Sequence, residues 1–174
     1  MNLRSLIVAA TLVLASGAGH ADEWKTYSSK DGRFSVLMPG KPQEQTQEVK
    51  APEGKLSVHL LFSALDRDRV IFVSYSDVPA KAIEGKQDTF LDSTVKGNVN
   101  SLKGKLLSAK KIEVGKGKRP GRDVLIDLPD KKQMYRSRIV LSGQRLFQVV
   151  ALGSEEFVKG KDVGQYLDSF KIGE

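Results

Sequence analysis

The feature that most constrains the fold of this chain is a series of four strand-length segments in its second half, joined by polar links. The expected strands are residues 105–114, 123–128, 133–141 and 145–152. The last two links span only residues 129–132 and 142–144, which suits antiparallel hairpins. Parallel neighbours would need a crossover of a dozen or more residues. This half of the chain therefore predicts an antiparallel sheet.

The first half adds further strands to this pattern. Residues 24–27 and 34–38 flank a turn that contains the sequence Asp-Gly, a strong hairpin signal. Residues 56–63 alternate between apolar and polar side chains, whereas residues 70–75 are apolar on both sides, as in a strand covered on both faces. Residues 43–55 are polar and are expected to form a loop or an edge strand.

Two segments show the periodicity of amphipathic helices. The first is expected over residues 88–103, with Asp88 as its N-cap and Gly104 as its stop. The second lies near the end of the chain. Their apolar stripes are Leu91, Val95, Val99 and Leu102 in the first and Val163, Tyr166, Leu167 and Phe170 in the second. Strands with two helices predict an α+β fold, an antiparallel β-sheet with helices on both faces, or α/β/α sandwich.

The beginning of the chain has the three parts of a secretory signal peptide. Arg4 provides the basic start, residues 6–15 form an uncharged and mostly apolar run, and small residues precede Ala21. We expect residues 1–21 to be a signal peptide cleaved near Ala21, residues 22–174 to be a single domain, and the mature protein to be periplasmic or secreted. No later run reaches the length of about 20 apolar residues that a transmembrane helix needs.

Positive charge is concentrated in one segment. Residues 103–122 contain eight lysines and arginines and only one acidic residue, Glu113, so their net charge equals the formal +7 of the whole chain. Within the segment, a glycine-rich stretch is expected to form a hairpin tip that could bind phosphates or sulfates by charge. The predicted anion-binding residues are Lys116, Lys118, Arg119 and Arg122. The alternative is a solvated turn that keeps the sheet from aggregating.

The sequence offers weaker support for catalysis or metal binding. Cysteine is absent, which excludes thiol chemistry and a lipoprotein anchor, and His59 is the one histidine beyond the expected signal peptide. A zinc site needs three or four ligands, and no second histidine or cysteine accompanies His59. The carboxylate pairs Asp66 with Asp68 and Asp123 with Asp127 are interpreted as solvated side chains. We therefore expect no catalytic residues, no metal and no cofactor.

Several short segments resemble the PsbP-like family. They are residues 24–27 (WKTY), 31–36 (DGRFSV), 38–42 (MPGKP), 119–123 (RPGRD), 144–150 (QRLFQVV) and 166–170 (YLDSF). The resemblance implies an α/β/α sandwich around an antiparallel sheet. It also implies an accessory role, since the namesake is an extrinsic subunit of photosystem II that is not an enzyme. The short leader is of the bacterial type, and bacteria that do not photosynthesise carry many such domains with no assigned role.

Three functional hypotheses follow. The first is an exported, non-catalytic binding or accessory protein of the cell envelope, with an unidentified envelope protein as partner. The second is a module that binds a polyanion, such as lipopolysaccharide, anionic lipid or nucleic acid, through residues 103–122. The third, an envelope hydrolase, has the least support, because the sequence holds no nucleophile elbow and His59 is the only imidazole left to serve as a base.

Overall fold

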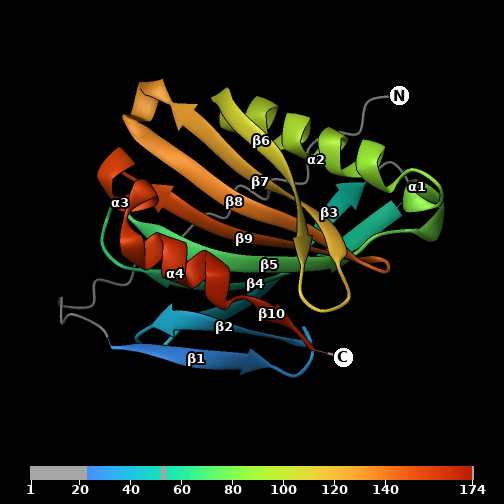
Figure 1. Ribbon diagram of the computed structural model, residues 1–174, viewed down its shortest axis with the longest axis horizontal. Coiled ribbons are helices and arrows are strands. Elements are labelled where there is room, and N and C mark those ends of the chain that lie inside the picture. Colours follow the sequence, from blue (N-terminus) through green and yellow to red (C-terminus); the bar gives the residue numbers. More distant parts are fainter. Residues whose placement is uncertain (1–22, 52–53, 174) are drawn as a thin grey trace.

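The computed structural model describes residues 23–51 and 54–173, and the expected signal peptide lies outside this part (Figure 1). Four α-helices occur in the described residues: α1 (Ala80–Ile83), α2 (Gln87–Leu102), α3 (Glu155–Lys159) and α4 (Lys161–Ser169). The strands are β1 (Trp24–Ser29), β2 (Phe34–Pro39), β3 (Gln43–Ala51), β4 (Gly54–Ala64), β5 (Val70–Asp77), β6 (Lys105–Val114), β7 (Arg119–Leu128), β8 (Gln133–Ser142), β9 (Arg145–Gly153) and β10 (Lys171–Ile172).

The strands form two antiparallel sheets. The large sheet has the order β3-β4-β5-β9-β8-β7-β6, and the small sheet has the order β1-β2-β10. In the large sheet, β6 to β9 are successive hairpins, so the predicted antiparallel sheet is confirmed. The polar segment expected as a loop or edge strand is strand β3, which lies at the edge of the large sheet and pairs with β4. The separation of the first hairpin into a second sheet was not predicted.

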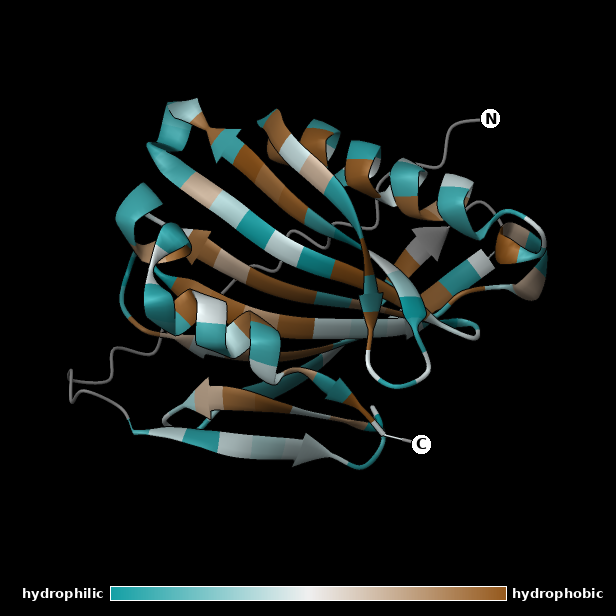
Figure 2. Ribbon diagram, viewed as in Figure 1, coloured by the Kyte–Doolittle hydropathy of each residue, from teal (hydrophilic) through white to brown (hydrophobic). Residues whose placement is uncertain are grey.

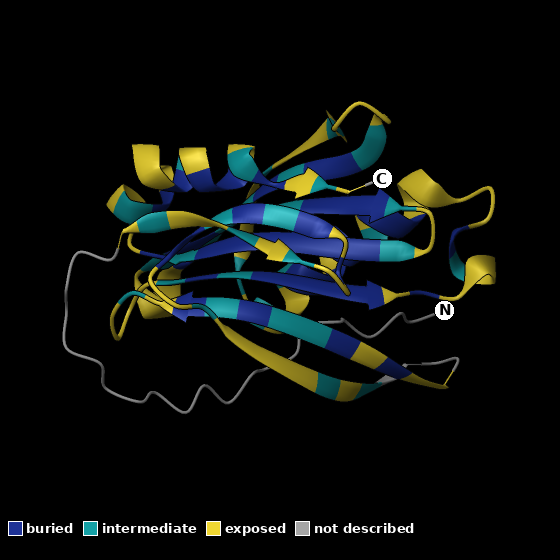
Figure 3. Ribbon diagram, turned by 90° about the horizontal axis from the view of Figure 1, so that it is seen from below, coloured by how far each residue is buried: buried dark blue, intermediate teal, exposed yellow. Residues whose placement is uncertain are grey.

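Each face of the large sheet is covered differently. Helix α2 packs on one face, where Leu91 and Val95 join Ile126 and other residues of β7 to β9 in one core cluster. On the opposite face, a second cluster joins the large sheet to β2 and α4, with Val36, Val149 and Tyr166 among its members. Figure 2 shows apolar residues along the central strands, and Figure 3 shows the same strands buried. The prediction of a mixed fold of helices and strands with a large antiparallel sheet is confirmed. One face of that sheet is covered by the small sheet together with helices.

Helix α2 is shifted slightly from its predicted bounds. It begins at Gln87, so Asp88 lies in the first turn and is not the N-cap, which is Lys86. It ends at Leu102, and the following C-cap residue, Lys103, has a φ of 53° that reverses the chain. Gly104 follows because a side chain there would collide with Ile126 and Leu128 on β7.

The buried stripe of α2 also differs from the prediction. Leu91 and Val95 are buried, as expected, but Val99 and Leu102 are only half-buried. The polar residue Asn98 is buried instead, and its amide donates a 2.8 Å hydrogen bond to Gln148 Oε1 on β9. The second half of the helix therefore faces the sheet partly through a polar contact.

Candidate anion-binding site

The predicted hairpin tip is the β6–β7 turn. Gly115 and Lys118 both have positive φ, at 69° and 44°, and the Lys118 amide donates to the Gly115 carbonyl oxygen. Lys116 and Lys118 are exposed. Within the described part of the chain, neither lysine forms an ion pair. The turn thus presents two free ammonium groups to solvent.

Arg119 begins β7 and lies beside this turn. Its Nε donates a 2.9 Å hydrogen bond to Ser142 Oγ at the end of β8. Its guanidinium also lies against the turn glycines, since a Cβ built on Gly117 would be 3.2 Å from Arg119 Nη1 and one on Gly115 would be 3.3 Å from it. The glycines therefore leave room for the arginine to fold back over the turn.

Arg122 does not belong to the tip, which corrects the expectation that it joins the other three cations. Its side chain is only 2% exposed, its Nη2 lies 2.7 Å from Asp88 Oδ1, and its Nε lies 2.7 Å from Asp92 Oδ1. The hydrogen bonds from Arg122 and Lys111 lower the pKa of the Asp88 carboxyl. Both carboxylates come from α2, more than two dozen residues earlier in the chain, so no local sequence pattern could predict their ion pairs with Arg122. Arg122 is a structural ion-pair residue.

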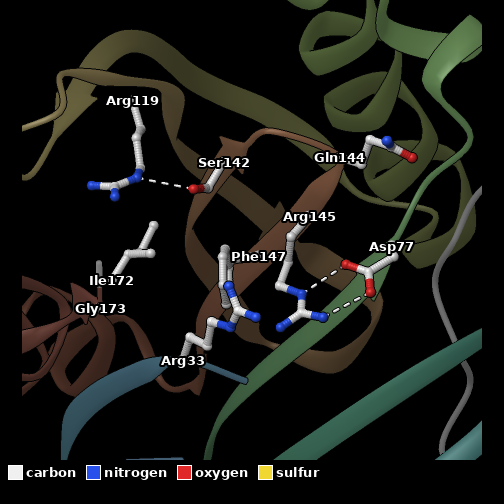
Figure 4. Close-up of a pocket in the computed structure, with 9 residues that line it drawn as sticks. All are labelled: Arg33, Asp77, Arg119, Ser142, Gln144, Arg145, Phe147, Ile172 and Gly173. Carbon is white, nitrogen blue, oxygen red and sulfur yellow. Dashed lines mark hydrogen bonds and ion pairs between the residues drawn. The ribbon is translucent and has the colours of Figure 1, made fainter. Parts of the chain in front are cut away.

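A hollow of about 380 Å³ lies between the two sheets, close to the hairpin tip (Figure 4). Three arginines line it: Arg33 from the β1–β2 turn, Arg119 from β7 and Arg145 from β9. Among the described residues, the single carboxylate in its lining is that of Asp77, and Phe147 and Ile172 are its apolar members. Of these, only Arg119 was singled out from the sequence. Arg33 and Arg145 carry no local signal, because folding brings them together from separate hairpins.

Arg145 is held in place by several contacts. Its Nε and Nη2 each lie 2.7 Å from a carboxylate oxygen of Asp77, and its Nη1 donates to the Asp31 carbonyl oxygen at 2.8 Å. The guanidinium also lies over the Tyr75 ring, 5.1 Å from its centroid. The hydrogen bonds from Arg145 lower the pKa of Asp77.

His59 stacks on the ring of Tyr75. Its ring lies 4.6 Å from that of Tyr75 at an angle of 13°, and its Nδ1 is 3.0 Å from Thr46 Oγ1. Across residues 23–51 and 54–173, no three His, Cys, Asp or Glu side chains are grouped so that they could hold a metal ion.

One member of each carboxylate pair named in the sequence analysis has a structural partner. Asp66 accepts hydrogen bonds from the amides of Asp68 and Arg69, which shapes the β4–β5 turn. Asp123 lies 3.4 Å from Arg138 Nε on the neighbouring strand. These contacts account for Asp66 and Asp123 as turn-forming and ion-pairing groups.

Within the described residues, no helix combines the length and apolar character needed to cross a bilayer.

Comparison with solved structures identifies a PsbP-like fold. The chain is similar to the solution structure of cyanobacterial PsbP (CyanoP) from Synechocystis sp. PCC 6803, with a TM-score of 0.61. The match covers 92% of this chain and 98% of that chain at 13% sequence identity. No family model and no curated protein matches the sequence. The predicted resemblance is therefore confirmed at the level of the fold.

Proposed function

We propose that this chain is an exported, non-catalytic accessory protein of the cell envelope, in which residues 22–174 form one PsbP-like domain that binds a partner protein. The observation that carries the proposal is the signal-peptide pattern of residues 1–21 in front of a domain with this fold. The resemblance to a family whose namesake is an extrinsic, non-enzymatic subunit supports the accessory role.

Export predicts a defined mature protein. After expression in its native bacterium, the protein should appear in the periplasmic or secreted fraction, and its N-terminal residue should be Asp22, since the small residues before it suit a signal peptidase. Edman sequencing of the fractionated protein measures this. Replacing Ala21 with lysine should block cleavage there. Recovery of cytoplasmic protein that still begins with Met1 would contradict export.

The accessory role is tested by crosslinking in intact cells. Crosslinking that yields no envelope protein would contradict this role.

A second candidate function is polyanion binding at the β6–β7 turn. It is favoured by the exposure of Lys116 and Lys118 without carboxylate partners in the described chain, next to Arg119. Mutual repulsion of these cations offers no benefit to folding, whereas a phosphate-bearing surface would offset it. Arg122 is omitted from the proposed surface because its charge is already neutralised by Asp88 and Asp92.

The tip can be tested by removing its two free charges. Lys116→Ser/Lys118→Ser should weaken binding to anionic liposomes, lipopolysaccharide and heparin. For duplex DNA, each lost phosphate contact should reduce the slope of log K against log salt by about 0.9. The matched control is Lys131→Ser/Lys161→Ser, which removes two exposed lysines elsewhere on the molecule. Cosedimentation at low and moderate salt gives the affinities. Equal binding by the parent and both double variants would show that the tip is a solvated turn.

A further inference from the structure

The hollow between the two sheets has the features of a ligand site separate from the lysines of the β6–β7 turn. Arg33, Ile172 and Gly173 reach it from the small sheet and its β1–β2 turn, while Arg145 and Phe147 reach it from the large sheet. We propose that this pocket binds a small organic anion, in which a carboxylate or phosphate group is attached to an apolar moiety. This inference goes beyond the proposed accessory role and does not depend on it.

The charge of the pocket favours an anion. Among the described residues, three guanidinium groups and one carboxylate line the pocket. That carboxylate, Asp77, already accepts two hydrogen bonds of 2.7 Å from Arg145. Arg33 and Arg119 have no carboxylate partner among the described residues. Guanidinium groups match the geometry of carboxylate and phosphate oxygens and bind them through paired hydrogen bonds. An anion entering the pocket would therefore neutralise charge that the described residues leave uncompensated.

The floor of the pocket favours a ligand with an apolar part. Ile172 is half-buried and lines the pocket, so it offers apolar surface to a ligand. Phe147 also lines the pocket, but it is only 1% exposed and contributes little surface of its own. Figure 4 shows Phe147 among the lining residues of the pocket, together with the side chains of Arg33 and Arg145. Inorganic phosphate would meet the guanidinium groups but leave this surface uncovered. The volume of about 380 Å³ lies within the usual range for small-molecule sites.

The lining is also held in place before any ligand arrives. Arg145 is fixed by Asp77, by the Asp31 carbonyl and by the ring of Tyr75. The Gly173 amide donates a 2.7 Å hydrogen bond to the Arg33 carbonyl oxygen, which ties β10 to the turn that carries Arg33. Arg119 is oriented by Ser142. The guanidinium groups of Arg145 and Arg119, which are positioned in this way, lose little conformational entropy when a ligand binds.

The proposal is tested by titrating the purified, ¹⁵N-labelled protein with four probes: phenyl phosphate, benzoate, inorganic phosphate and benzyl alcohol. The amide resonances of Arg33, Arg145, Phe147 and Gly173 should shift with phenyl phosphate, benzoate or both, which identifies the preferred anionic group. Inorganic phosphate should bind more weakly than phenyl phosphate, and benzyl alcohol should cause no comparable shift. Arg33→Gln should raise the dissociation constant about tenfold or more, since it removes a charge-assisted contact.

Matched variants distinguish binding in this pocket from binding elsewhere on the protein and from loss of the fold. Arg67→Gln removes the same charge from an exposed arginine in the turn at the opposite end of β5 and should bind as the parent does. Lys116→Ser/Lys118→Ser should also retain the probe, so loss of polyanion binding and loss of the pocket are distinguishable. A thermal midpoint equal to that of the parent would show that Arg33→Gln leaves the fold intact. Arg119→Gln is a second variant that removes a positive charge from the same pocket. The proposal is overturned if neither anionic probe shifts these resonances at about 10 mM, if benzyl alcohol binds equally well, or if Arg67→Gln weakens binding as much as Arg33→Gln.

Discussion

Replacing both Asp88 and Asp92 with asparagine should destabilise the protein more than replacing their common partner, Arg122, with methionine. Arg122 is 2% exposed, whereas the two carboxylates are 61% and 56% exposed. The double asparagine variant leaves a buried guanidinium without a counter-charge, which is costly. Arg122→Met leaves two carboxylates that water can solvate, and the methionine side chain fills part of the vacated space. We expect Arg122→Met to cost about 2–3 kcal/mol for the lost charged hydrogen bonds.

Urea unfolding of the parent, the two variants and the triple variant measures these effects. The triple variant should be more stable than the double asparagine variant, because it no longer buries an unpaired charge. If the double asparagine variant is more stable than Arg122→Met, Arg122 is not buried as the structure places it.

The same ion pairs predict a dependence on pH. The pKa of Asp88 is lowered in the folded state, so its contribution is present above the ordinary carboxyl pKa of about 3.9 and is lost as the pH falls through the lower folded value. The difference in the free energy of unfolding between the parent and Arg122→Met should therefore become smaller below about pH 4.

The second large effect is expected in the core beneath α2. Leu91 is 0% exposed and packs in the cluster that joins the helix to β7, β8 and β9. Leu91→Ala should lower the free energy of unfolding by about 3 kcal/mol, from lost burial and the cavity left behind. Val99→Ala, at a half-buried position of the same helix, should cost about 1 kcal/mol or less.

Thermal and urea unfolding of both variants provide the comparison. Lys96→Ala is the control, because Lys96 is an exposed residue of the same helix. The sequence pattern treats Leu91 and Val99 as equivalent members of one stripe. Equal costs for the two alanine variants would support the pattern and contradict the packing described here.

Most of the large sheet could be predicted from local patterns. The links after β7 and β8 contain three or four residues in the sequence-based prediction, and so few residues permit only antiparallel pairing of neighbours. Edge strand β3 was recognised as a candidate by its polar composition. The small sheet was missed because β10 has only two residues, Lys171 and Ile172, and pairs with β2 from the other end of the chain. So short a strand has no periodicity to detect.

The sequence by itself determined most of the strands and the two longer helices, how consecutive strands pair, and where positive charge accumulates, because these depend on neighbours along the chain. Only the tertiary structure decided what each cation does. Arg122 lost its place in the predicted anion site because α2 carries Asp88 and Asp92 to it, and Arg33 gained a place beside Arg145 because two sheets meet at one end. The physical reason is that the charge of a side chain is fixed by its chemistry, but its burial and its counter-charges are set by residues that only folding brings near.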